Sequence, residues 1–592
     1  MFKPIGHWQI IANRYQGLLV LWSNNNTYGG MIRFENNTSW EVLKNISYDS
    51  QTNRISFTRN TQEYTGLGKI NGFTGKFREG RNSYLWNALQ IDSPLSKIQS
   101  TDPNVKHIDS RIHSPISQKI LVLVEERIIS SMLSTFNGGN SVLARYLDDL
   151  NREGFEVHMY SYDVRSSESG LQEHHHHPTE VLRLYKYIRD FYFASNCLIN
   201  GVVLIGDFPA AGTCNFYDEQ KNNSIEQHEL DYFCVDVMLS DPYGYWEWLP
   251  LAPMIPAGSS EMTRLPYDEN RHPGGMLYPR DQWSAPGFVH TRQSEVHHSQ
   301  RDSRKYGSEP KFWIGRITAA QSAWITGPNG WEYSFDEEIR QLVDYFDRNH
   351  FHRTNRRNGR GYIFIEKDWA GGWRNQKDKM ARILNQNNIV VNADSPDFNI
   401  NNKASISNYF ESFRQDYLVC EYIMHSDWLN HSFSSESGQD TFPNNFPNSF
   451  RTTGSNYLVN IPKNTVKSIH LIANPNKSNL PRFYLLGGCD VGAILFRPKY
   501  MDQEQLSPAT KLNRQYGAHV LGVSYLMHAN GLAVLAHNVT NPPSDYTQLY
   551  EEWRNGKSFG DAVLSLMNQE NNSRLPHYRN VIFGDPTLRL SY

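Results

Sequence analysis

The stretch Phe483-Tyr484-Leu485-Leu486-Gly487-Gly488-Cys489-Asp490 begins as an apolar run and ends in a thiol. A second apolar run, Leu418–Met424, ends at His425. Buried parallel strands read as nearly continuous apolar runs, and open α/β sheets carry their chemistry at the carboxyl ends of such strands. We therefore expect the Cys489 thiol and the His425 imidazole to face each other at one edge of a parallel sheet. A thiol with an imidazole beside it is the smallest set of groups that a cysteine nucleophile and its general base require.

From about residue 115 onward, strand-like and helix-like segments alternate. Ile120–Val124 reads as a buried strand, and an amphipathic helix over Val142–Leu150 follows it. Such alternation predicts a parallel sheet with right-handed crossovers. The further strands expected are Phe155–Tyr160, Gly201–Asp207, Lys311–Ile317, Tyr362–Ile365, Ile389–Val391, His519–Tyr525 and one at the C-terminus, with helices from Pro178 and around Asp336–Phe346, Lys377–Leu384 and Ser558–Met567.

The pattern divides the chain into an all-β part and two α/β units. Residues 1–95 hold short strand-like segments between Asn- and Gly-rich turns, which predicts a small barrel-like domain with a structural, docking or recognition role. Residues 96–112 are expected to be a linker. The first α/β unit is expected over 113–350, with a long loop at 208–310, and the second over 351–592, with an insertion at 427–480.

Composition excludes several classes of function. The net charge of −3 gives no reason to expect a nucleic acid or an anionic membrane as a partner. No run approaches the length of a transmembrane helix, and the N-terminus lacks the apolar core of a signal peptide. We therefore expect a soluble protein that stays in the cytoplasm, with secretion by another route as the alternative.

The cysteines and the histidine run do not suggest a metal site. The five cysteines show no paired spacing and no Cys-x-x-Cys, so neither a disulfide framework nor a zinc site is indicated. The four consecutive histidines 174–177 would point in different directions, so a solvated loop is expected there rather than a metal centre. A reducing compartment fits this pattern and would keep Cys489 as a thiol.

Several motifs, in order, resemble those of the gingipain-type cysteine peptidase family. The resemblance covers roughly residues 115–592 and leaves the N-terminal part unexplained. Each motif alone has little weight, but their order over so long a stretch makes coincidence improbable. Besides the His425 and Cys489 strand ends, the motifs are Val203–Asp207, Val235–Tyr243, Ile314–Ile317, Gly556–Val563 and Phe583–Leu590.

The resemblance implies two tandem parallel-sheet units of the caspase-hemoglobinase type, the second of which is catalytic. It implies Cys489 as the nucleophile and His425 as the base, with backbone N–H groups of Ser426 and Cys489 as the oxyanion hole. The family usually has His-Gly where this chain has His425-Ser426, and serine keeps the N–H donor.

A third group is expected to orient His425. Asp207 and Asp241 are candidates because both follow strand-like or loop segments of the first unit, near the expected edge; turn capping is the alternative role for both. His431 is a second candidate base. No cofactor is required, although related peptidases can bind a structural calcium, for which Asp236 and Glu229 are candidates.

The function expected from these features is that of a cysteine endopeptidase, which hydrolyses peptide bonds of a protein or peptide substrate through a thioester acyl-enzyme. The main alternative is a catalytically silent peptidase-like scaffold that binds a protein or glycan partner through its β-domain. A regulatory or activating partner is also expected if the β-domain or the insertion covers the cleft.

Overall fold

The computed structural model describes most of the chain. It describes residues 6–13, 15–24, 27–34, 41–69, 72–91, 105–111, 118–133, 141–164, 178–195, 199–210, 212–221, 224–234, 236–242, 246–249, 287–290, 310–327, 330–355, 359–426, 430–433, 465–467, 471, 479–488, 491–492, 520–537, 545–570 and 580–590. Cys489 and histidines 174–177 lie outside these ranges, as does most of the insertion 427–480. Among the described helices, none has the length and apolar character needed to cross a membrane.

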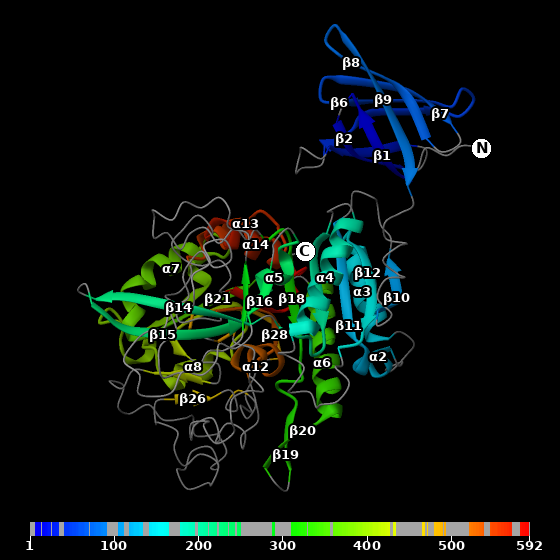
Figure 1. Ribbon diagram of the computed structural model, residues 1–592. Helices are drawn as coiled ribbons and strands as arrows, with labels where there is room; N and C mark the ends of the chain where they lie inside the picture. Colours follow the sequence, from blue (N-terminus) through cyan, green and yellow to red (C-terminus); the bar gives the residue numbers. More distant parts are fainter. Residues whose placement is uncertain are drawn as a thin grey trace.

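A mixed sheet of 11 strands forms the larger lobe of the molecule (Figure 1). Its strand order is β10-β12-β11-β13-β18-β29-β28-β27-β23-β21-β22. Most neighbours are parallel, while β10 is antiparallel to β12 and β29 is antiparallel to β28. The strands are β10 (Val105–Arg111), β11 (Lys119–Glu125), β12 (Glu156–Tyr162), β13 (Ile199–Ile205), β18 (Trp313–Ile317), β21 (Arg360–Ile365), β22 (Ile389–Ala393), β23 (Tyr417–Ile423), β27 (Arg482–Leu486), β28 (Gly531–His537) and β29 (Asn580–Gly584).

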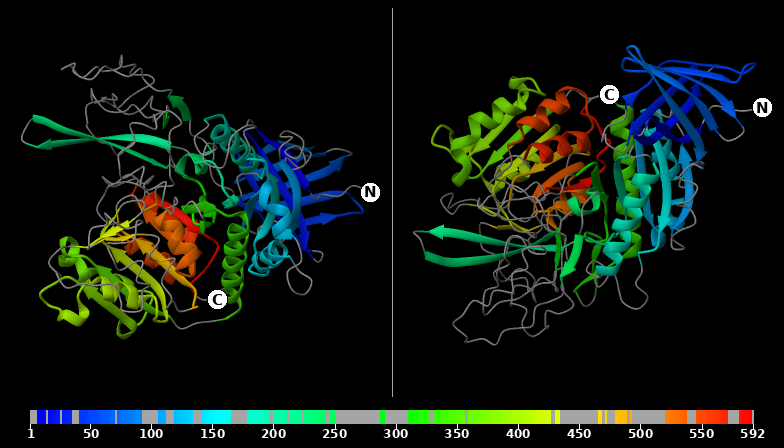
Figure 2. Two further views of the ribbon diagram at one scale, coloured as in Figure 1. Left: turned by 90° about the horizontal axis from the view of Figure 1, so that it is seen from below. Right: turned by 45° about the horizontal axis from the view of Figure 1, so that its top comes forward.

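Helices lie on both faces of this sheet (Figure 2). One group packs together around α6 (Phe335–Thr354) and contains α2 (Glu126–Leu133), α3 (Val142–Arg152) and α12 (Leu521–His528). In a second group, α13 (Thr547–Arg554) packs against α7 (Trp373–Met380) and α14 (Phe559–Glu570), and α4 (Pro178–Ala194) packs against α5 (Asp236–Ser240). The remaining helices are α8 (Ile406–Ser412) and the 3₁₀ helices η2 (Lys367–Gly372), η3 (Gln386–Asn388) and η4 (Ile400–Asn402). The α/β prediction from residue 115 onward is confirmed as a mixed α/β fold.

Three predictions for this lobe need correction. The run from 519 to 525, predicted as a strand, forms helix α12 from Leu521, and the strand is β28, which follows it. The helix is buried on nearly all sides, so it shows no amphipathic pattern, and a short apolar run does not distinguish helix from strand. The linker predicted at 96–112 contributes β10 to the sheet edge. The loop 208–310 contains the paired strands β14 (Gly212–Lys221) and β15 (Ser224–Cys234), as well as β16 (Trp246–Leu249) and β17 (Gly287–His290).

Helix α6 connects the two halves of the sheet. Ser334 caps its first turn by accepting a hydrogen bond from the Glu337 N–H, as expected of an N-cap serine. The helix starts beside the carboxyl end of β11, where Arg127 bonds Glu338 at 2.7 Å. It ends where Arg353 pairs with Glu153, just before β12 starts. Strand direction reverses once between the two halves, because β29 is parallel to β18 and antiparallel to β28.

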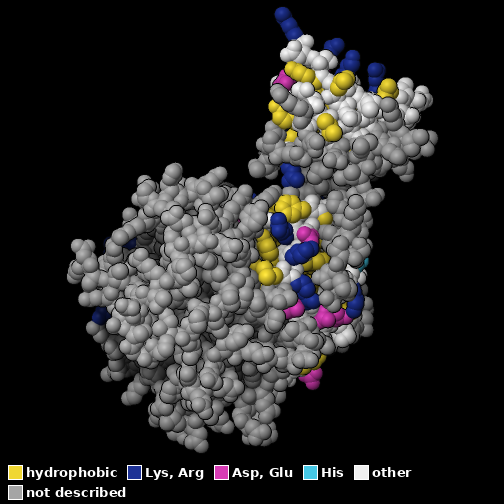
Figure 3. Space-filling model, in the orientation of Figure 1, with side chains coloured by type: hydrophobic (Ala, Val, Ile, Leu, Met, Phe, Trp, Pro, Cys, Tyr) yellow, Lys and Arg dark blue, Asp and Glu magenta, His cyan; other side chains and the backbone are white. Residues whose placement is uncertain are grey.

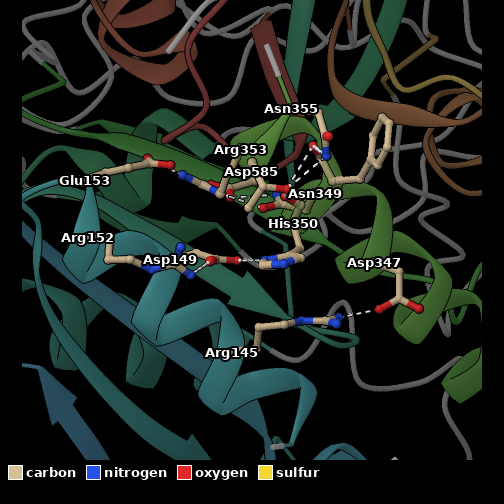
Figure 4. Close-up of polar contacts among 12 residues, drawn as sticks. Arg145, Asp149, Arg152, Glu153, Asp347, Asn349, His350, Arg353, Asn355 and Asp585 are labelled. Carbon is tan, nitrogen blue, oxygen red and sulfur yellow. Dashed lines mark hydrogen bonds and ion pairs between the residues drawn. The ribbon is translucent and has the colours of Figure 1, made fainter. Parts of the chain in front are cut away.

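A buried polar network fixes the end of α6 (Figure 4). Arg353 donates to Asp585 at 2.6 Å and to Asn349 at 2.7 Å, and it also pairs with Glu153 at the end of α3. Asn349 donates to Asp585 at 2.8 Å, and the Asp585 side chain has no exposed surface. The network therefore holds α3, α6 and the segment after β29 together.

The N-terminal strands form a separate antiparallel sheet, which makes the smaller lobe (Figures 1 and 3). Its order is β4-β3-β2-β1-β9-β8-β7-β6-β5. β4 pairs with β3, and β5 follows β4 after a single residue and pairs with β6, so the sheet closes on itself. The all-β prediction for this part of the chain is confirmed. The strands are β1 (Gly6–Ala12), β2 (Tyr15–Asn24), β3 (Thr27–Phe34), β4 (Glu41–Val42), β5 (Lys44–Asp49), β6 (Arg54–Arg59), β7 (Gln62–Lys69), β8 (Gly72–Glu79) and β9 (Asn82–Ile91).

Aromatic side chains fill the inside of this barrel. Trp8 lies 4.7 Å from Phe73 between ring centroids, and Tyr64 stacks on Phe57 at the same distance. A Cβ at Gly66 would lie 2.5 Å from the Trp86 ring, so this glycine makes room for the core rather than for a turn. Among the described side chains, the interior is thus a packed core.

Candidate functional site

Three neighbouring parallel strands end at the candidate site. β23 lies between β21 and β27, and the registers pair Ile365 with Ile423 and Tyr422 with Leu486. The residues that leave these strand ends therefore emerge side by side. They are Glu366 after β21, His425 after β23, and Gly487 and Gly488 after β27.

His425 forms a close pair with an acid from the neighbouring strand end. Its Nε2 lies 2.6 Å from Oδ2 of Asp368, which sits in the first turn of η2. Both side chains are accessible, with 48% of His425 and 61% of Asp368 exposed. The contact leaves Nδ1 as the ring nitrogen that can exchange a proton with another group.

Glu366 and Trp369 complete the surroundings of the imidazole. The Glu366 N–H continues the β21–β23 ladder by donating to the Ile423 carbonyl at 2.9 Å. Its carboxylate is buried, and Oε2 lies 3.7 Å from Nε2 of His425. The Trp369 ring lies 6.1 Å from the imidazole between centroids. This cluster could hold a divalent cation. It offers one ligand atom each from Glu366, Asp368 and His425, and these three atoms all lie within 4.8 Å of one another.

Ser426 lies directly against the end of the β27 segment. A Cβ at Gly488 would be 2.2 Å from Oγ of Ser426 and 2.9 Å from the Met424 carbonyl oxygen, so only glycine fits there. His425 and Ser426 form β24, which pairs with β25 (Asn430–Ser432), and β25 pairs with β26 (Thr465–Lys467). The register places Ser426 opposite His431, and their side chains are hydrogen-bonded.

The acid beside His425 is Asp368 rather than Asp207 or Asp241. Asp207 follows β13, and four strands separate β13 from β23. At about 4.8 Å between neighbouring strands, β13 and β23 lie roughly 24 Å apart across the sheet. Asp241 follows Ser240, whose carbonyl accepts from the Lys311 N–H just before β18, in the other half of the sheet.

The sequence carried a signal for the acid that was missed. The run Tyr362–Ile365 is followed by Glu366-Lys367-Asp368, a strand end with two acids in the same half of the chain as His425. Strand-end acids occur in both halves, so the pattern alone did not choose between them.

Other predicted residues have different surroundings. Cys420 is buried in β23, and burial raises the pKa of its thiol to about 11, as suits a core cysteine. Asp236 forms a buried pair with Arg316, at 2.7 and 2.9 Å, so calcium would compete with a guanidinium for this carboxylate. The Glu229 side chain lies outside the described side chains. Calcium binding stays a prediction.

Glu421 is a buried carboxyl four residues before His425. It has no exposed surface, and its Oε2 accepts a hydrogen bond from Tyr550 at 2.9 Å. Burial raises the pKa of Glu421 from 4.5 to about 7. The folded chain therefore holds this proton at a pH where the unfolded chain has released it, so stability falls as pH rises from about 4.5 to about 7.

Glu421→Gln is expected to stabilise the protein at high pH only. Gln keeps an oxygen acceptor for Tyr550 but cannot ionise, so the gain should be on the order of 3 kcal/mol near pH 8 and near zero around pH 4.5. Urea unfolding of both proteins at these two pH values measures it. Glu411→Gln, on an exposed position of α8, serves as the control. A Glu421→Gln gain that does not grow with pH would show that the carboxyl titrates normally.

Comparisons with known proteins were made at three levels. No family model matches the chain, and no curated protein matches it. Among solved structures, it is similar to the Arg-specific cysteine proteinase gingipain R, with a TM-score of 0.39 and 11% identity over 80% of this chain and 78% of that one. It is also similar to metalloproteinase-II from Bacteroides fragilis, with a TM-score of 0.10 and 10% identity over 34% of this chain and 65% of that one. At these TM-scores, neither likeness decides the fold or the activity.

Proposed function

We propose that this protein is a cysteine endopeptidase with Cys489 as the nucleophile and His425 as its base, and with Asp368 orienting the imidazole. One observation carries the proposal. The strand that ends in His425, paired with Asp368 at 2.6 Å, lies beside the strand whose last described residue is Gly488. Gly488 packs against Ser426 and is followed in the sequence by Cys489.

The strand order supports two tandem units of the caspase-hemoglobinase type. Each half of the sheet contains four of these strands in the same spatial arrangement. Numbered by their order along the sequence, the strands lie in the order second, first, third, fourth, as β12-β11-β13-β18 in one half and β22-β21-β23-β27 in the other. The strand pairings show which residues correspond between the two halves. Glu125 in the first half corresponds to Glu366 in the second, and Asp207 corresponds to His425. Only the second half has an imidazole at this position, so we assign the chemistry to that unit.

The reaction requires a proton acceptor and a donor at the same edge. Because Nε2 of His425 is held by Asp368, Nδ1 is the nitrogen that would take the thiol proton. The thiolate sulfur then attacks the peptide carbonyl carbon, and the imidazolium returns the proton to the leaving amine as the C–N bond breaks. Water hydrolyses the resulting thioester with His425 again as base. Backbone N–H groups of Ser426 and Cys489 would bind the oxyanion, each worth about 3 kcal/mol.

Asp368→Asn is expected to lower kcat/KM by about 10- to 100-fold. This is less than the loss of a general base itself, because Asp368 is exposed and acts through His425. Steady-state kinetics on a cleaved peptide measures the effect. Asp397→Asn, which alters an exposed ion pair with Arg374, is the matched control. Asp368→Asn should add nothing in a His425→Ala background, and a full further loss there would contradict the orienting role.

Cleavage of a diverse peptide library tests the function. The full chain is incubated under reducing conditions, with and without calcium, before and after alkylation with iodoacetamide. Cleavage that alkylation abolishes supports a thiol peptidase, and the cut sites supply the specificity. Cleavage that survives alkylation would exclude a cysteine nucleophile. Loss of cleavage when calcium is withdrawn would establish the cation as a requirement.

A further inference from the structure

A buried chain of hydrogen bonds ends at Ser426. The Ser426 hydroxyl lies 2.6 Å from Nδ1 of His431, whose Nε2 lies 2.8 Å from the hydroxyl of Tyr525. The Tyr525 hydroxyl in turn lies 2.6 Å from that of Tyr409. This series of hydrogen bonds thus runs from α8 through α12 and β25 to the residue after His425.

The members of this chain are held rigidly. His431 is 1% exposed, and Tyr409 and Tyr525 are fully buried. Each tyrosine ring meets the imidazole edge-on, at 5.7 Å between centroids. Only Ser426, at the end, reaches solvent. Such packing leaves the imidazole little freedom to turn.

The protons of the chain can be assigned in one direction. The Ser426 hydroxyl also donates to the Met424 carbonyl at 3.3 Å. In this direction the Tyr409 hydroxyl donates to the Tyr525 hydroxyl, which donates to Nε2 of His431. The Nδ1–H of His431 then donates to the Ser426 hydroxyl, so each of these hydrogens makes one hydrogen bond. In the reverse direction, the Tyr409 proton has no acceptor among the described residues. Burial also lowers the pKa of His431 to about 3, which keeps the ring neutral and unsuited to act as the base.

We propose that His431, as the neutral Nδ1–H tautomer, is a positioning residue that fixes Ser426 and thereby the backbone N–H beside His425. Nδ1–H holds the Ser426 hydroxyl against the Met424 carbonyl. The same serine packs on Gly488, so the bond sets the spacing between the strand end of His425 and the segment leading to Cys489. The catalytic part of this inference rests on the proposed function.

A double-mutant cycle tests the positioning role. His431→Phe should lower kcat about 10-fold with KM changed less than about 2-fold, since a displaced oxyanion donor acts in the transition state. His431→Asn places an amide N–H near the position of Nδ1–H and should restore most of kcat. In a Ser426→Ala background, His431→Phe should have no further effect. An equal loss of kcat in both backgrounds would mean a merely structural role and would overturn the proposal.

A spectroscopic measurement decides the tautomer independently of turnover. Nitrogen NMR of the full chain with labelled histidine should show a His431 ring protonated at Nδ1 near pH 7, with a signal that shifts in Ser426→Ala. A ring protonated at Nε2, or at both nitrogens, would overturn the proposal even if His431→Phe fails to fold. A wild type that cleaves no peptide would count against the proposed function, while this spectrum would still decide the tautomer.

Discussion

Cys489→Ala is expected to abolish peptide cleavage, with a loss of about 10⁴-fold or more in kcat. The thiolate is the attacking group in the proposed mechanism, and alanine offers no replacement. Folding should be retained, because the strand before this position is specified by the buried run Arg482–Leu486. Library cleavage by wild type and variant, purified side by side, measures the loss.

Cys420→Ala is the matched control for this variant. Cys420 is also a thiol in the same half of the sheet, but it is fully buried and burial raises its pKa, so it should be inert. Turnover by Cys489→Ala at the wild-type rate would end the cysteine peptidase proposal. Turnover by neither protein would favour the scaffold alternative, unless limited proteolysis or a partner restores it in the wild type only.

Arg353→Met is expected to lower the free energy of unfolding by about 3–5 kcal/mol. The substitution leaves Asp585 and Glu153 without their guanidinium partner, and a buried carboxylate that loses its partner is strongly destabilising. The network joins α3, α6 and the segment after β29, so its loss should weaken the junction between the two halves of the sheet (Figure 4). The urea midpoint of the larger lobe, followed by tryptophan fluorescence, measures the change.

Arg145→Met provides the comparison on the same helix pair. Arg145 pairs with Asp347 between α3 and α6, but both side chains are partly exposed, and exposed pairs contribute about 0–1 kcal/mol. If both variants lowered the free energy of unfolding equally, the loss would come from removing one positive charge and not from burial of its partners.

Local pattern predicted much of this architecture. The apolar runs before His425 and at 483–486 are fully buried strands, because a strand covered on both faces needs apolar residues at every position. The alternation of strands and helices likewise predicted that these strands belong to a parallel sheet, and the structure makes them neighbours. The same reasoning failed at Leu521–His528, since a helix buried on all sides is as uniformly apolar as a strand.

The partner of His425 was decided by tertiary structure. Glu125, Asp207, Glu366 and Asp368 all follow apolar strands, so each satisfies the same sequence pattern. Only the strand order sets β21 beside β23 and leaves four strands between β13 and β23. The sequence determined which side chains reach the edge of the sheet. Long-range pairing between strands decided which of them meet, because hydrogen-bonded neighbours lie about 4.8 Å apart whatever their separation in the chain.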